Sequence, residues 1–162
     1  MMVNVYTYGV ACVLVLSFAF GCSPTLINNS PVEATQENLA VWDKVEEYRL
    51  SMEERDVDRL MNLVSREYFD NFATTDKNED DYGYESLRLR LAPVLRNNAK
   101  KVRVSIRLTA MKIENSRAEV QFEYTARFLI SEGGRDSWES RNDFNRLVFA
   151  RENDDWKITE GL

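Results

Sequence analysis

The chain has 162 residues, a length that suits one domain, and its 44% hydrophobic and 30% charged residues are typical of a globular protein. Its net charge is −6 and all of its charged side chains follow Cys22, so we predict no binding to nucleic acid and no electrostatic docking to anionic lipid. Histidine is absent, and the two cysteines, Cys12 and Cys22, both lie in the N-terminal apolar segment. These two facts exclude Ser-His-Asp and Cys-His catalysis, histidine-bound zinc and a disulfide in the rest of the chain.

The N-terminus has the pattern of an export signal. Residues 10–20 form an apolar run that suits the hydrophobic region of a signal peptide and is shorter than the roughly 20 residues of a membrane-spanning helix. The segment Ala19-Phe20-Gly21-Cys22 that ends this run resembles the bacterial lipobox, in which a small residue precedes an acylated cysteine. The residues before the run include no Lys or Arg, so a secreted or signal-anchored chain, or a buried apolar element, stays open as an alternative.

The lipobox resemblance implies a signal peptide over residues 1–21 and a lipid on Cys22. A diacylglycerol thioether and an additional acyl chain at the new amino terminus would anchor the chain stably, because each buried methylene contributes about 0.8 kcal/mol. Ser23 follows the cysteine where an Asp would retain a Gram-negative lipoprotein in the inner membrane. The predicted localisation is therefore the cell envelope, on the periplasmic face of the outer membrane if the source is Gram-negative. Residues 22–35 hold two prolines and several small polar residues, which predicts a flexible tether.

Three helices are predicted next. Residues 36–55 carry apolar side chains at spacings of three and four, and residues 57–68 repeat this pattern after an N-capping Asp56. Residues 70–82 are polar and acidic, which predicts a loop. A third helix is expected over residues 84–95, with an end or a kink at Pro93 because proline lacks an N–H group.

After Lys100 the apolar period changes to two, which predicts four antiparallel strands. The turns are expected at Asn115-Ser116, at Gly133-Gly134 and at 153–155, and a phase slip at Ala110-Met111 predicts a bulge. Three helices followed by a four-stranded meander give an α+β fold over residues 36–162.

The chain resembles the nuclear transport factor 2-like superfamily, which includes ketosteroid isomerases and polyketide cyclases. The segments that carry the resemblance are 55–61, 68–70, 80–87, 145–149 and 156–162. The resemblance implies that the helices pack on a curved sheet to make a cone, with a pocket between the helices and the concave face. It indicates the fold and leaves the activity open, because this fold hosts enzymes and non-enzymes.

The acidic loop has part of a calcium-binding pattern. Asp76, Asn78 and Asp80 occupy its first, third and fifth positions, but Asp81 stands where the pattern needs Gly and Leu87 where it needs Glu. A solvated acidic loop is the favoured interpretation, and a looser calcium site is the alternative.

Five residues are candidates for the cone pocket. Asn142 and Arg146 share the parity of Trp138, Phe144 and Val148, so strict alternation would point them into the cone and offer Arg146 to an anionic ligand. A bulge that turns Arg146 outward, leaving Leu147 and Phe149 in the core, is the favoured alternative.

The other three candidates are two phenols and a carboxylate. Tyr68 and Tyr124 could donate a hydrogen bond in the pocket, or could be core tyrosines with a solvated hydroxyl. Asp70 could be a general base if it were buried, although a structural carboxylate at the end of a helix or in a loop is favoured.

These observations predict a membrane-anchored, non-catalytic binding module of the cell envelope. Its expected partners are the bilayer, through acylated Cys22, and a small apolar ligand or an envelope protein. We expect a monomer with no cofactor. The alternative function is a small isomerase, cyclase or hydratase that uses a carboxylate base and a tyrosine donor.

Overall fold

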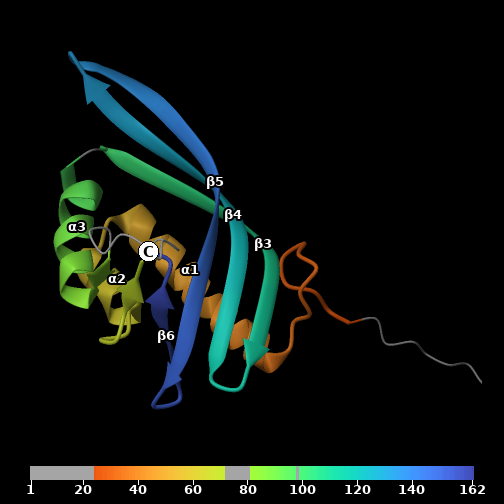
Figure 1. The fold of residues 1–162 in the computed structure, drawn as a ribbon. Coiled ribbons are helices and arrows are strands. Elements are labelled where there is room, and N and C mark those ends of the chain that lie inside the picture. The colour runs from red at the N-terminus through yellow and green to blue at the C-terminus, as the bar shows by residue number, and fades with distance from the viewer. Residues whose placement is uncertain (1–23, 72–80, 98) are drawn as a thin grey trace, which may run out of the picture.

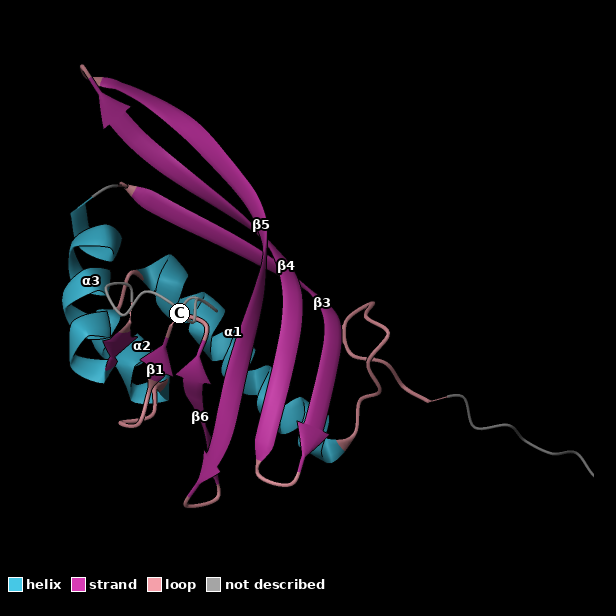
Figure 2. Cartoon of the chain, in the orientation of Figure 1, coloured by secondary structure: helices cyan, strands magenta, loops and turns pink. Residues whose placement is uncertain are grey.

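The computed structural model describes residues 24–71, 81–97 and 99–162. It has three helices, a four-stranded antiparallel sheet and a two-stranded sheet. Figure 1 and Figure 2 show the helices together on the concave side of the bent large sheet, while the tip of one long hairpin extends beyond them. The predicted α+β order and the four-stranded antiparallel sheet are confirmed.

The first two helices each begin after a capping residue. Helix α1 (Gln36–Glu54) begins after Thr35, whose hydroxyl accepts a 3.1 Å hydrogen bond from the Asn38 N–H. Helix α2 (Val57–Leu63) begins after Asp56, whose carboxylate accepts from the Arg59 N–H at 2.9 Å. Helix α3 (Tyr84–Asn97) contains Pro93, so the expected end at this proline is wrong: the helix continues for a further turn.

The large sheet has the order β3-β4-β5-β6. Its strands are β3 (Lys101–Glu114), β4 (Arg117–Glu132), β5 (Arg135–Glu152) and β6 (Asp155–Glu160). All three predicted turns join consecutive strands, and their positive φ angles lie at Asn115, Gly133, Gly134, Asn153 and Asp154. The register between β3 and β4 shifts between Leu108 and Ala110, which confirms the predicted bulge. The short strands β1 (Phe69–Asp70) and β2 (Tyr82–Gly83) pair with each other at the two ends of the acidic loop.

The core lies between the concave face of the sheet and the apolar stripes of α1 and α2. The largest fully buried side chains are Phe122, Phe149, Leu60, Leu87, Leu108, Leu147 and Ile158. Burial of this kind stabilises the fold by about 25 cal/mol per Å² of apolar surface removed from water. No helix in the described part of the chain is long and apolar enough to cross a membrane.

The prediction of a flexible tether over residues 22–35 needs correction at its C-terminal side. Ile27 and Val32 are only 3% and 7% exposed and belong to the main core cluster. The Ile27 N–H donates to the Val32 carbonyl at 2.9 Å, and the Ala34 N–H donates to the Thr25 carbonyl at 2.7 Å. These two bonds close a turn that docks two apolar side chains on the domain, and the gain from their burial exceeds the entropy that a free chain would keep.

Candidate functional site

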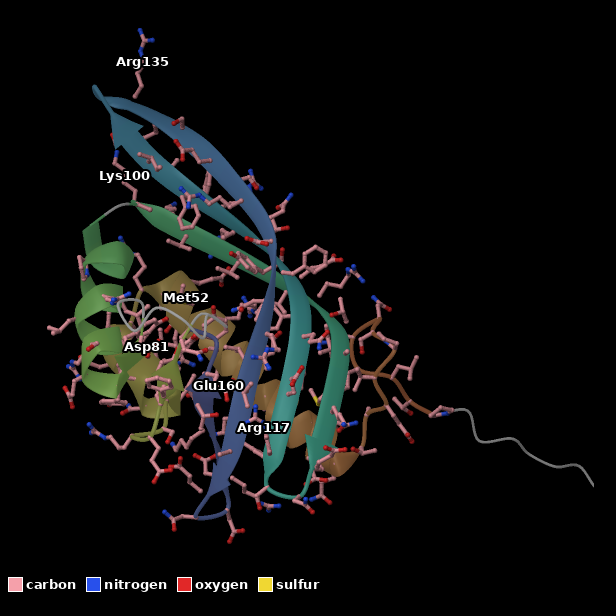
Figure 3. The ribbon with its side chains drawn as sticks, viewed as in Figure 1. Met52, Asp81, Lys100, Arg117, Arg135 and Glu160 are labelled. Atoms are coloured by element: carbon pink, nitrogen blue, oxygen red, sulfur yellow. The ribbon has the colours of Figure 1, made fainter. Side chains whose placement is uncertain are left out.

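A cavity of about 300 Å³ lies between the helices and the concave face of the sheet, and we call it the cone cavity. It is lined mainly by apolar and aromatic side chains from α1, α2, α3, β3 and β4, and Leu162 lies at its edge. Met52 is on the α1 side of this space (Figure 3). The lining residues are Tyr48, Met52, Leu60, Leu91, Val104, Ile106, Phe122, Tyr124, Ala126, Phe128, Arg141, Asn145 and Leu162. Concave, mostly apolar sites with a few polar groups are the usual form of small-molecule pockets.

Alternation along two paired strands places the polar groups of the cone cavity. Strand β4 presents Phe122, Tyr124, Ala126 and Phe128 on its concave face. Directly opposite Ala126 on β5 is Arg141, and directly opposite Phe122 is Asn145. Paired residues share a face of the sheet, so Arg141 and Asn145 join the aromatic side chains of β4 in the cavity wall.

Tyr48 supplies a phenol from the helix side of the cone cavity. Its ring packs against that of Phe122, with the ring centroids 6.4 Å apart. Burial, together with the nearby phenol of Tyr124, raises the pKa of Tyr48 to about 12. Tyr48 therefore keeps its proton at neutral pH and can act as a hydrogen-bond donor in the cavity.

None of the described residues that line the cone cavity has a carboxylate side chain. Asp70 lies outside it, where its Oδ2 accepts a 2.9 Å hydrogen bond from the Gly161 N–H and a 3.2 Å bond from the Tyr68 hydroxyl. The Tyr68 hydroxyl also accepts from the Leu162 N–H at 3.0 Å. The structure thus brings Asp70 and Tyr68 together as a clamp that holds the last residues. Of the five residues predicted for the pocket, Tyr124 is the one that lines the cone cavity.

Asn142 and Arg146 project from the convex face of the sheet. The register of β4 and β5 is continuous and pairs them with Thr125 and Gln121, which alternate with the concave-facing residues. The Arg146 guanidinium forms ion pairs with Glu119 at 3.3 Å and Glu160 at 3.4 Å. Hydrogen bonds from the Gln121 amide and from Arg146 lower the pKa of Glu119. The inward orientation considered for these two residues is therefore wrong.

The three residues after Arg146 are all buried, although successive residues of a strand point to opposite faces of the sheet. Leu147, Val148 and Phe149 are all fully buried. The register between β5 and β6 shifts between Val148 and Phe149. A shift of this kind lets consecutive residues of a strand be covered. It lies after Arg146, so the outward orientation that we favoured for Arg146 is present without the bulge that we expected to produce it.

A second, more open depression of about 800 Å³ adjoins the same elements. Asp70, Tyr124, Asn145 and Arg146 are among its lining residues, so four polar groups from distant segments meet there. Asp70 and Arg146 already have protein partners in the contacts given above. This depression is accordingly a poorer candidate for a ligand site than the less open and more apolar cone cavity.

The calcium candidates Asp76, Asn78 and Asp80 lie outside the described residues. Within the described ranges, no group of three or more Cys, Asp or Glu side chains is arranged to hold a metal ion. Cys22 and the signal peptide also lie outside the described residues.

Sequence reasoning missed Tyr48, Arg141 and Asn145 as cavity residues. One signal could have found the last two. A two-residue turn at Gly133-Gly134 pairs Glu132 with Arg135, and counting back along both strands places Arg141 opposite Ala126. Tyr48 could only be assigned to the apolar stripe of its helix, because periodicity does not show where that stripe leaves a space.

Buried tyrosines give the protein a specific alkaline sensitivity. Burial raises the pKa of Tyr48 to about 12 and also raises the pKa values of Tyr68 and Tyr82 above the ordinary value of 10. Above pH 10 the unfolded chain loses these protons first, so the stabilisation is complete below pH 10 and declines as the pH rises towards 12. Unfolding free energies measured in urea from pH 8 to 11.5 should fall over this range, and Tyr48→Phe should fall less steeply. An equal slope for the variant would contradict the assignment to Tyr48.

No family model matches the chain, and no curated protein sequence is significantly similar to it. Many solved structures match its fold. A nuclear transport factor 2-like superfamily protein from Salmonella enterica has a TM-score of 0.60 at 13% identity, covering 77% of this chain and 86% of that one. A conserved protein from Planctomyces limnophilus has a TM-score of 0.63 at 13% identity, with 77% and 92% covered.

A third match is named as an enzyme candidate. It is a protein from Streptomyces avermitilis named as a candidate dehydratase of the same superfamily, with a TM-score of 0.61 at 12% identity, and 77% of this chain and 93% of that one are covered. Similarity at this level of identity shows the fold alone, because one fold carries many activities.

Proposed function

Because the chain has the nuclear transport factor 2-like fold, we propose that it is a non-catalytic binding module of the cell envelope. It holds a small apolar ligand in the cone cavity and is anchored to a membrane through a lipid on Cys22. The observation that carries the ligand part of the proposal is the mainly apolar cavity of about 300 Å³. The anchor part rests on the lipobox-like segment that ends at Cys22.

The composition of the cavity wall supports binding over the isomerase, cyclase or hydratase alternative. The alternative function relies on a carboxylate base, which must lie within hydrogen-bond reach of the substrate. The described cavity wall offers phenols, an amide and a guanidinium, and the candidate base Asp70 is engaged by the Gly161 N–H. An apolar ligand could enter this cavity without leaving a buried carboxylate unpaired.

The packed turn that begins at Thr25 shortens the distance between Cys22 and the folded domain. Residues 22–35 as a free chain would let the domain move roughly 40 Å from its anchor. With the turn closed by the Ala34–Thr25 hydrogen bond, only Ser23 and Pro24 separate Cys22 from the folded domain, a reach of about 10 Å. The proposed anchor would therefore hold the domain close to the lipid surface.

A cavity-filling substitution tests the ligand site. We expect Ala126→Leu to weaken binding of the uncharged fluorophore N-phenyl-1-naphthylamine by about tenfold, because the added carbons occupy space that the probe needs. Probe fluorescence would be titrated with protein, and circular dichroism would confirm that the variant is folded. Ala126 is almost completely buried in the wall of the cavity.

Thr125→Leu is the matched control, because Thr125 is the neighbouring residue on the same strand and does not line the cone cavity. It adds apolar surface without filling the cavity and should leave the probe affinity unchanged. If the folded Ala126→Leu variant bound the probe as well as the natural chain, the cone cavity would not be the binding site.

A further inference from the structure

Arg141 is the only charged side chain among the described residues that line the cone cavity. It lies directly opposite Ala126 on the neighbouring strand, and the residues on either side of Ala126 on this face are Tyr124 and Phe128. Arg141 therefore lies in the cavity wall beside the small side chain of Ala126, and it is also exposed to solvent.

The guanidinium of Arg141 forms no ion pair or hydrogen bond within the described part of the protein. Other arginines on the same hairpin differ: Arg146 pairs with Glu119 at 3.3 Å, and Arg127 lies over the Trp138 ring at 5.2 Å. Glu139 and Asp143 share the concave face with Arg141 at two residues' distance, and neither forms an ion pair with it. Asp143 instead accepts a 2.8 Å hydrogen bond from the Phe144 N–H.

Two phenols add neutral donors to the same cavity. The hydroxyls of Tyr48 and Tyr124 both belong to lining residues, and they form no hydrogen bond with other described residues. A phenol that remains protonated can donate to an acceptor but cannot neutralise a cation. The cavity thus combines one unpaired positive charge and two donors with an otherwise apolar wall.

We propose that the ligand of the cone cavity is an amphipathic monoanion, whose apolar body fills the cavity and whose carboxylate pairs with Arg141. This inference rests on the proposed ligand-binding function and specifies the chemical class of the ligand. Arg and a carboxylate match in geometry, because the planar guanidinium can donate two parallel hydrogen bonds to the two oxygens. The phenols could donate to further oxygen atoms of the same ligand.

The size of the cavity limits the apolar part of this ligand. An apolar cavity of about 150 Å³ in another protein is large enough to hold benzene. The cone cavity has about 300 Å³, so it suits a bicyclic aromatic acid or a branched-chain acid of similar volume.

A pair of ligands that differ only in charge tests the proposal. We expect the full domain to bind 2-naphthoate about tenfold more tightly than the uncharged 2-naphthamide in isothermal titration calorimetry. A hydrogen-bonded charge pair that is partly open to solvent supports a difference of this order. In Arg141→Gln the preference should disappear, because the affinity for 2-naphthoate falls to that for 2-naphthamide while the latter affinity is kept.

Arg135→Gln is the matched control. Arg135 is on the same strand but at the far tip of the hairpin (Figure 3), away from the residues that line the cavity. This variant carries the same change in net charge, so it should keep the preference for 2-naphthoate. Loss of the preference in both variants would indicate a general charge effect and would overturn the role of Arg141.

The remaining outcomes separate this inference from the proposed function. Equal affinity of the natural domain for the two ligands would overturn the anionic ligand class while leaving an apolar site in the cavity. Loss of both ligands in a folded Arg141→Gln variant would show that Arg141 shapes the cavity without recognising charge. If neither ligand bound the natural domain and the neutral fluorophore failed as well, the ligand-binding function itself would be overturned.

Discussion

Replacing Cys22 by serine is expected to abolish incorporation of a palmitate analogue and to leave the precursor uncleaved. The serine hydroxyl cannot form the thioether on which the subsequent processing of a lipoprotein depends. Cys22 is the predicted acceptor of the lipid, whereas the uncleaved apolar run 10–20 would stay on the variant and hold it at the membrane. The effect should therefore approach complete loss of labelling. It would be measured by metabolic labelling, followed by electrophoresis that separates the precursor from the shorter mature form.

Cys12→Ser is the internal control for this experiment. Cys12 lies within the apolar run that the predicted cleavage would remove, so its loss should change neither the labelling nor the size of the mature product. Labelling that persisted in Cys22→Ser, or an unlabelled full-length chain in the cytosol, would contradict the prediction of a lipoprotein. The neutral-probe assay on the isolated domain does not depend on this result.

Gly161→Ala is expected to lower the free energy of unfolding by about 3 kcal/mol or more. Gly161 has a φ of +99°, a conformation that residues with a side chain rarely adopt. A Cβ atom there would overlap the carbonyl oxygen of Arg146 and would lie 3.3 Å from the Cα of Leu147, so the backbone of β5 or of the C-terminal segment would have to move. Overpacking against backbone adds to the cost of the strained φ.

The Gly161→Ala substitution should also disturb the cone cavity. The Gly161 N–H donates to Asp70 at 2.9 Å, its carbonyl accepts from the Asn145 amide at 3.1 Å, and the next residue, Leu162, lines the cavity. Hydroxyl groups from Tyr68 and Tyr82 bind the Leu162 backbone as well. A variant that remains folded at low temperature should therefore bind N-phenyl-1-naphthylamine more weakly.

Gly134→Ala separates strain from overpacking. Gly134 also has a positive φ, +78°, but nothing lies within 4 Å of the position that its Cβ would occupy. Gly134→Ala should lower the free energy of unfolding by only about 1–2 kcal/mol, the usual penalty of a left-handed conformation for an L-residue. Chemical denaturation of both variants would measure the difference. Equal destabilisation by the two substitutions would show that the C-terminal segment is not held as tightly as the contacts of Gly161 indicate.

The local elements of this fold follow from its residues and their spacing. The capping residue Asp56 marked where the second helix begins, because its side chain satisfies an N–H group that the helix leaves free. The turns at Asn115 and Gly133-Gly134 were predictable because few residue types tolerate a positive φ. The change of apolar period after Lys100 predicted the sheet, and the phase slip predicted its bulge at Leu108 and Ala110.

The side chains that reach the cone cavity depend instead on contacts between distant segments. Periodicity shows that Asn142 and Arg146 share a face of their strand, but pairing with a distant strand decides which face the helices cover. A shift of one position along the strand exchanges the two faces. The face towards the cone cavity carries Arg141 and Asn145 instead. Asp70 lies outside the cone cavity, where it accepts a hydrogen bond from the Gly161 N–H, a partner 91 residues away in the chain. Ile27 and Val32 became core residues because the folded domain offered them an apolar surface. Local sequence encodes backbone preference, whereas burial is set by contacts between segments that the chain brings together only when it folds.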